Sequence, residues 1–308
     1  MLGLVAAGAA AGCLGGVFSE RLDALTHLAP IWLACGLGAL VLGALFARAV
    51  ERKAIVALGL AAVVAVGALM APELLAAARQ PPPASGITTV KLVQFNLWAE
   101  NHDPEGSLAW ILAQKADVVL VEEGGGQSAW TVRQLHKTYR HVVSCDGDHA
   151  CDTWIVSRWP MTARRGFRQD GQPLAGAWAT LRRPEGDFTV AAAHFVWPIP
   201  AGRQQAQSRI LVANLARFDH DSLIVAGDFN STPWSAALRR QDKALGLERR
   251  TRALASWPSG DFSRLARAPF PLLPIDHVYA GKAWKTVSVE RGPALGSDHR
   301  PVVVTLTQ

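Results

Sequence analysis

Charged side chains are scarce in the first 80 residues of this 308-residue chain. Five basic and four acidic residues occur there, so this segment has a net charge of +1, against +6 for the whole sequence. Three apolar runs, at residues 2–18, 28–47 and 54–72, contain no charge at all. A bilayer core needs about 20 helical residues, with a range of roughly 17–25. The sequence therefore predicts an all-α transmembrane segment of three helices within residues 1–78, the first of them at the lower limit of length.

No lysine or arginine precedes the first run, which argues against a cleavable signal peptide. Three successive runs rich in Gly, Ala, Leu and Val argue equally against core helices of a soluble domain. Between the second and third runs, Arg48, Arg52 and Lys53 outnumber Glu51, and basic loops tend to stay in the cytoplasm. We therefore expect a cytoplasmic amino terminus and an extracytoplasmic position for everything after the third run.

Cysteine is also rare, and the four present lack the close pairs that are usual in structural zinc sites. Cys13 and Cys35 fall in apolar runs, where cysteine behaves as a small hydrophobic residue. Cys145 and Cys151 bracket a polar turn. A disulfide between them in an oxidising compartment would contribute about 2 kcal/mol. The alternative, a metal site using Cys145, His149 and Cys151, ranks below it.

The rest of the chain is mildly basic and has no internal repeat. Residues 79–87 contain the stiff stretch QPPPASG and predict a linker to a domain over residues 88–308. Residues 81–308 have a net charge of +5 (26 basic minus 21 acidic), which agrees with a phosphate-bearing substrate or an anionic surface. The paired arginines are scattered and form no stripe typical of nucleic-acid binding. Strand-like segments outnumber helical ones, which favours sheets packed face to face with helices outside.

The stretch LIVAGDFNSTP, at residues 223–233, has the pattern of a buried strand that ends in polar groups. Asp228 and Asn230 are two residues apart, a spacing that points both side chains to one face. Pro233 suits the first turn of a following helix, with Ser231 or Thr232 as its N-cap. A turn in which Asp228 and Asn230 cap backbone amides is the alternative.

Six strand ends carry polar groups with no evident role in the core. They are Asn96; Glu123; His194; Asp228 with Asn230; Asp276 with His277; and Asp298 with His299. A lone histidine of this kind is more often a hydrogen-bonded core residue, but acids, amides and imidazoles at six ends indicate metal-assisted phosphate chemistry. Hard oxygen ligands favour Mg²⁺ or Mn²⁺ over zinc.

From Val90 onward the chain resembles the endonuclease/exonuclease/phosphatase superfamily. The resemblance is carried, in the family's order, by QFNLW, DVVLVEE, AAHFVWP, AGDFNSTPWS, IDHVYA and GSDHRPV. It implies an α/β fold, the DNase I-like four-layered sandwich of two packed β-sheets flanked by helices, over residues 88–308. With the apolar segment in front, the arrangement is similar to bacterial membrane-anchored members of the superfamily.

The resemblance also implies a role for each matching residue. The metal site would comprise Glu123 as principal carboxylate, with Asn96 and Asp298 in the metal's surroundings. Among the catalytic residues, Asp228 would orient the attacking water and Asn230 and His194 would contact the phosphoryl oxygens. His299, held by Asp276, would act as acid, base or charge stabiliser. The family usually has Gln where this chain has Glu122, whose extra charge could bind a second metal or water or face away.

These observations predict a membrane-anchored, Mg²⁺- or Mn²⁺-dependent phosphoesterase that hydrolyses phosphodiester bonds. Nucleic acid is one expected substrate, and a phospholipid phosphodiesterase or lipid-headgroup phosphatase is the alternative. A catalytically inactive binding domain of the same fold is the second alternative. The expected partners are the phosphoester substrate and the lipid bilayer, with no obligate protein partner. The expected location is a bacterial inner membrane, with several spans and the catalytic domain on the periplasmic side.

Overall fold

The computed structural model describes residues 1–86, 88–263 and 266–308. The chain divides into two compact units. The helical unit comprises Met1–Gln80, Trp197–Gln205 and Ser231–Gln241. The sheet unit comprises Pro81–Val196, Ala206–Asn230 and Asp242–Gln308. The first 80 residues therefore pack with two short segments from much later in the sequence, which the apolar pattern alone does not predict.

The three apolar runs are helical, as predicted. The helices are α1 (Leu2–Leu14), α3 (Ala29–Phe46) and α4 (Ala49–Ala78). They pack through small residues: a Cβ placed on Gly59 would lie 2.9 Å from the carbonyl oxygen of Gly36. Such close backbone approach is common between membrane helices. By length and composition two segments, Glu20–Phe46 and Ala49–Ala78, could cross a bilayer, and Leu2–Val17 is shorter.

The loop between the first two apolar helices packs against Ser231–Gln241. It contains the short helical turns η1 (Gly15–Val17), α2 (Glu20–Asp23) and η2 (Ala24–Leu28). The carboxylate of Asp23 accepts hydrogen bonds of 2.7 Å from each of the backbone amides of Ala236 and Ala237. These amides begin α8 (Ala236–Leu245). The loop therefore satisfies helix-end donors that would otherwise be buried without a partner.

Two further side-chain contacts hold the same loop. The Trp234 indole donates to the carbonyl of Thr26 at 2.7 Å, and His27 Nδ1 lies 3.2 Å from both the amide and the hydroxyl of Thr232. The predicted N-cap of α8 was wrong. Ser235, not Ser231 or Thr232, accepts the hydrogen bond from Leu238 N, at 3.0 Å, because the helix begins at Ala236.

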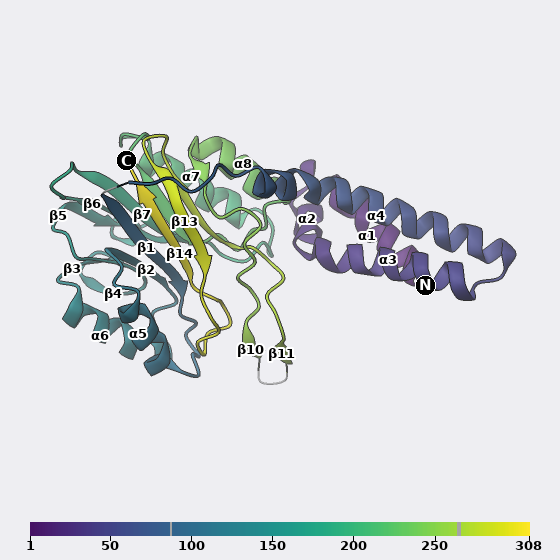
Figure 1. The fold of residues 1–308 in the computed structure, drawn as a ribbon, viewed down its shortest axis with the longest axis horizontal. Coiled ribbons are helices and arrows are strands. Elements are labelled where there is room, and N and C mark those ends of the chain that lie inside the picture. Colours follow the sequence, from purple (N-terminus) through teal and green to yellow (C-terminus); the bar gives the residue numbers. More distant parts are fainter. Residues whose placement is uncertain (87, 264–265) are drawn as a thin grey trace. The chain divides into compact units, whose positions relative to one another are not determined.

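The sheet unit contains two six-stranded sheets (Figure 1). The first has the order β13 (Lys285–Arg291), β14 (Val302–Thr307), β1 (Thr89–Asn96), β2 (Val118–Glu122), β4 (His149–Ser157), β3 (His141–Asp146). The second has the order β5 (Met161–Gly166), β6 (Ala175–Leu181), β7 (Phe188–His194), β8 (Ile224–Asp228), β12 (Asp276–Ala280), β9 (Glu248–Arg249). The pairs β1–β2 and β7–β8 are parallel.

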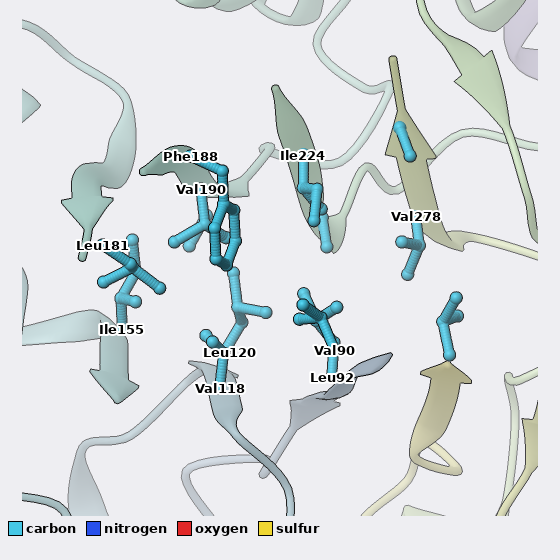
Figure 2. Close-up of a cluster of buried hydrophobic side chains, with 14 of the residues drawn as sticks. Val90, Leu92, Val118, Leu120, Ile155, Leu181, Phe188, Val190, Ile224 and Val278 are labelled. Atoms are coloured by element: carbon cyan, nitrogen blue, oxygen red, sulfur yellow. The ribbon is translucent and has the colours of Figure 1, made fainter. Parts of the chain in front are cut away.

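The core lies between the two sheets, because alternate residues of each strand face inward. Figure 2 shows Leu92, Leu120 and Ile224 among the side chains that meet there. The intervening residues of the first sheet, such as Val93 and Val119, form a second buried cluster. That cluster includes Ile111 of α5 (Pro104–Ala113) and Leu135 of α6 (Ala129–Thr138), the helices beside this sheet in Figure 1. The predicted fold of two packed sheets flanked by helices is confirmed.

The outer face of the second sheet is covered as well. Phe218, shortly after α7 (Arg203–Leu215), packs on Trp178 of β6 with ring centroids 4.7 Å apart. Four strands are not predicted by alternation: β5, β9, and the hairpin of β10 (Gly260–Ser263) and β11 (Ala266–Ala268). β5 reads MTARRG and is mostly exposed, so it lacks an apolar face to recognise.

The turn between β3 and β4 is closed by the predicted disulfide. Cys145 and Cys151 are bonded, with their Cα atoms 5.6 Å apart. Because both sulfurs are used, the alternative of a metal site at Cys145, His149 and Cys151 is excluded. Cys13 and Cys35 are free, as expected of cysteines in apolar helices.

Candidate active site

The polar residues of the site lie on the same inward-facing side of the strands as the apolar core residues, at one end of each strand. Along β1, Val90 and Leu92 lie in the core, and the same alternation leads to Gln94 and Asn96. The change from apolar to polar recurs at Glu122 of β2, His194 of β7, Asp228 of β8 and Asp276 of β12. Five strand ends from both sheets therefore supply one buried polar layer.

Asp228 and Asp276 are paired directly, because β8 and β12 run antiparallel in that register. Contacts across the two sheets complete the layer. The Asn96 amide donates to Asp228 Oδ2 at 3.1 Å, and the Gln94 amide donates to Asp276 Oδ1 at 2.7 Å. The predicted residues at 96, 228 and 276 thus lie together, although 132 and 182 positions of sequence separate the bonded pairs.

His299 is held between the two aspartates. Its Nδ1 lies 2.8 Å from Asp276 Oδ2, and its Nε2 lies 3.7 Å from Asp228 Oδ2. Burial alone would lower the pKa of His299, but the carboxylates of Asp276 and Asp228 outweigh it and raise that pKa well above its usual value. The two carboxylates therefore favour the protonated form of the imidazole, and Asp276 orients the ring, as the sequence predicts.

Asp228 is the centre of the layer. Burial raises its pKa to about 8, against the opposing effect of the His299 charge. Its Oδ1 accepts a hydrogen bond from the backbone amide of Asn230 at 2.8 Å, and its Oδ2 accepts one from the Asn230 side chain at 3.2 Å. Asn230 also donates to the carbonyl of Phe195 at 2.9 Å, and it adopts a positive φ of 46°. The carboxamide is thus fixed against Asp228 by a local turn, so the turn predicted as an alternative is part of the site.

Glu123 and His194 lie on the other side of Asp228. His194 Nε2 is 3.8 Å from Glu123 Oε1 and 3.7 Å from Asp228 Oδ2. Burial lowers the pKa of His194, and the charge of Glu123 opposes this effect, so the shift is opposite in direction to that of His299. The Glu123 side chain is 31% exposed. Its backbone has a φ of 50°, which departs from strand geometry, and its carboxylate accepts a hydrogen bond from Asn96 on the inner face.

Asn96 connects Glu123 to the buried acids. Its Nδ2 donates to Glu123 Oε1 at 3.0 Å as well as to Asp228, and its Oδ1 accepts from the amide of Trp98 at 2.9 Å. In this arrangement the nitrogen, rather than the oxygen, faces the carboxylates. The role of Asn96 in holding a metal stays a prediction.

Asp298 and His299 reach the site from the turn after β13. Ser297 lies in the same loop and connects it to β1. Its hydroxyl donates a hydrogen bond to the carbonyl of Asn96 at 2.7 Å and accepts one from the backbone amide of His299 at 3.0 Å. Burial raises the pKa of Asp298, and the charges of Glu123 and Asp276 add to this effect. Its Oδ2 accepts from the Trp257 indole at 3.0 Å, whereas its buried Oδ1 accepts no hydrogen bond from the residues that the structure describes.

A divalent cation fits these donors. Glu123 offers a partly exposed carboxylate, and Asp298 offers a buried oxygen that lacks a partner among the described residues. Oxygen donors of this kind suit Mg²⁺ or Mn²⁺. A second grouping overlaps the predicted catalytic residues instead: single ligand atoms of Asp228, Asp276 and His299 lie within 4.8 Å of one another. That trio is already tied internally by the bond between His299 and Asp276.

The structure adds residues that the sequence patterns did not assign. Glu122 is fully buried and accepts from the Gln94 amide at 2.9 Å, the same amide that binds Asp276. Burial, with the nearby charges of Asp276 and Asp228, raises the pKa of Glu122 well above its usual value. Gln94 and Ser297 were missed, although Gln94 stands two residues before Asn96 on the same face. His277 faces away and packs near Phe229, with centroids 5.8 Å apart, as expected of a structural residue.

Two face-to-face sheets with this site at their edge define a hydrolase of phosphoester bonds. The sequence model of the Endonuclease/Exonuclease/phosphatase family matches residues 93–299, and the chain belongs to that family. No curated protein matches the chain. Solved structures show the same fold at low sequence identity, so the likeness supports the fold and not a particular substrate.

Three of these structures illustrate the range. An endonuclease/exonuclease/phosphatase from Beutenbergia cavernae is 22% identical, with a TM-score of 0.52 and 71% of each chain covered. Beta toxin from Staphylococcus aureus, with bound magnesium ions, is 14% identical, with a TM-score of 0.53 and 70% and 99% covered. TDP2 from D. rerio, in complex with single-strand DNA product, is 11% identical, with a TM-score of 0.56 and 72% and 100% covered.

Proposed function

We propose that this chain is a membrane-anchored, Mg²⁺-dependent phosphoesterase that hydrolyses phosphodiester bonds outside the cytoplasm. The observation that carries the proposal is the position of Asp228. Its Oδ2 lies 3.7 Å from Nε2 of His299 and 3.7 Å from Nε2 of His194, and the pKa values of these two imidazoles are shifted in opposite directions. Paired groups whose pKa values are pushed apart by their surroundings are typical of acid–base sites.

Glu123 and Asp298 are the residues that would hold the cation, with Asn96 orienting Glu123. When bound, a divalent cation neutralises charge on the non-bridging oxygens of a phosphodiester. Asp228 orients the attacking water. Asn230 and His194 bind the phosphoryl oxygens, and the His299 cation stabilises the charge that develops in the transition state. Asp276 keeps His299 in one orientation and in its charged form.

A substrate panel with the full chain in detergent tests the reaction. Labelled DNA, phospholipid vesicles and the soluble diester bis(p-nitrophenyl) phosphate are each incubated with Mg²⁺ or with EDTA. We expect hydrolysis of the soluble diester that EDTA abolishes and Mg²⁺ restores. Hydrolysis that is unaffected by EDTA would contradict the metal assignment, and no hydrolysis of any of them would favour the inactive binding domain.

Nuclease activity and lipid hydrolysis are the two forms of this proposal. Proteins of similar fold span both, since TDP2 from D. rerio is bound to a DNA product and another, from Streptomyces griseocarneus, is a sphingomyelinase C. Hydrolysis of DNA without hydrolysis of vesicles would support the nuclease form. The apolar helices favour the lipid form, because a chain anchored in a bilayer through them would meet a lipid substrate at high local concentration.

A further inference from the structure

Beyond residue 78, large apolar side chains are exposed at only two places among those that the structure describes. One is the segment Val196–Ile199 and the other is Phe270 with Leu272. In the first, Trp197 is 56% exposed and Ile199 is 71% exposed. Residues 195–201 read FVWPIPA and contain no charge. Exposed apolar residues gathered in one short segment are typical of an interaction surface.

From Trp197 onward this segment belongs to the helical unit, which contains Trp197–Gln205. Pro198 and Gly202 line a small pocket together with Glu20 and Asp23, which lie between the first two apolar helices. A Cβ placed on Gly202 would lie 3.4 Å from Glu20 Oε2. A polar turn at the start of a segment long enough to cross a bilayer, here Glu20–Phe46, lies at the bilayer surface when that segment spans it. The segment around Pro198 therefore lies at the same level.

The turn itself also exposes apolar side chains at this level. Phe18 is 91% exposed, and Leu22 and Leu28 are exposed as well. Tryptophan is enriched where hydrocarbon meets the headgroups, because its ring is apolar and its N–H is polar. Trp197 and Ile199 thus belong to the same unit as Phe18, Leu22 and Leu28, which flank the apolar helices. Like them, they are apolar and exposed.

We propose that Trp197 and Ile199 insert into the surface of the bilayer that the helices span. Trp197 follows His194 by three residues, a distance of at most about 11 Å along the chain. The site is then held next to the headgroups, and the substrate class is the phosphodiester group of a membrane lipid. The substrate class rests on the proposed phosphoesterase function, whereas the insertion of Trp197 and Ile199 does not.

Insertion is tested with the full chain in phospholipid nanodiscs. The environment-sensitive fluorophore NBD is attached at Ile199→Cys in a Cys13→Ala, Cys35→Ala background. The matched control is Glu185→Cys, in the exposed turn before β7. That turn and residues 195–199 lie at opposite ends of this strand. Far-UV circular dichroism checks that both labelled chains are folded.

The expected result is a blue-shifted emission at position 199 that is quenched by spin-labelled lipid and protected from aqueous iodide. The label at position 185 should show the reverse. Equal quenching by iodide at the two positions would overturn the proposal. This readout needs no activity, so it stands or fails independently of the phosphoesterase assignment.

The substrate class is tested by activity. Trp197→Ala with Ile199→Ser should lower hydrolysis of phospholipid vesicles at least tenfold and leave hydrolysis of bis(p-nitrophenyl) phosphate unchanged. An equal loss on both substrates would show damage to the site and overturn the inference, as would unchanged hydrolysis of vesicles. If the unmodified chain hydrolyses the soluble diester and DNA but no lipid, the lipid class is wrong while the phosphoesterase assignment holds.

Discussion

The space between the two sheets has an apolar part and a polar part, built from the same face of the same strands. Val90 and Leu92 lie in the first part, and Gln94 and Asn96 continue the face into the second. On β12 the order is reversed, with Asp276 followed by Val278 and Ala280. A step of two residues thus separates side chains that stabilise the fold from side chains of the candidate site.

The two parts differ in what burial does. Burying apolar side chains stabilises the protein by roughly 25 cal/mol per Å². Burying carboxylates and imidazoles costs free energy that their mutual hydrogen bonds only offset, and replacing them with well-packed apolar residues is often neutral or stabilising. The polar layer is therefore explained by its chemistry and not by stability. Four predictions can break or sharpen this comparison.

The largest effect is expected at the apolar part. Leu120→Ala should lower the free energy of unfolding by about 2–5 kcal/mol, because it leaves a cavity in a close-packed core. The turnover of the molecules that remain folded should not change. Chemical denaturation followed by circular dichroism, together with activity per folded molecule, measures both. A reduced turnover at full folding would remove the distinction between the parts.

At the polar part we expect the opposite pattern. Glu123→Ala and His299→Ala should each raise the barrier to phosphodiester hydrolysis by about 2.7–4 kcal/mol, or 10²–10³-fold in rate. Circular dichroism and the unfolding midpoint show whether the variants fold. His277→Ala is the matched control for the histidine, since His277 is equally buried but faces away from the site. Full activity in either site variant would favour the inactive binding domain.

The disulfide lies outside both parts and tests stability without chemistry. Replacing Cys145 and Cys151 with serine should lower the free energy of unfolding by about 2 kcal/mol, as expected for a short closed loop. Activity towards the soluble diester should be retained. Addition of a reductant to the unmodified chain should shift the unfolding midpoint in the same direction, and no shift in either experiment would contradict the prediction.

The smallest effect is expected in the helical unit. Asp23→Ala should cost about 0.5–2 kcal/mol, because the amides of Ala236 and Ala237 lose their acceptor. Arg21→Ala, two residues away on the exposed side of the same turn, is the control. Thermal unfolding of the full chain in detergent compares the two. A destabilisation no larger than that of the control would show that the contact contributes nothing.

Much of the site was predictable because strand ends collect at sheet edges. The alternation around Asp228 and Asp276 placed both on one face, and their register brought them together. The pairing of Gln94 with Asp276 was beyond reach, since it depends on how two sheets meet across 182 residues of sequence. The turn of Glu123 toward Asn96 and His194 was equally hidden, because it rests on a positive φ that glutamate seldom adopts.

The apolar strands were predictable from the sequence, and the exposed or very short strands were not. β2 and β8 read as buried runs, whereas the exposed β5 and the two-residue β9 carry no pattern of their own. The three helices followed from scarce charge. Their grouping with Ser231–Gln241 did not, because it depends on the side chains of Asp23, Thr26 and His27 in a turn that looks like an ordinary connection.

That turn bears on how the chain can be divided. A fragment that starts at residue 81 would leave Trp234 and the first amides of α8 without the groups that accept their hydrogen bonds. Ser231 follows the site residue Asn230 directly, so the damage would begin one residue from the site. Removing the first 80 residues therefore removes the acceptors of hydrogen bonds from a segment that directly follows the candidate site, so activity is best measured on the full chain.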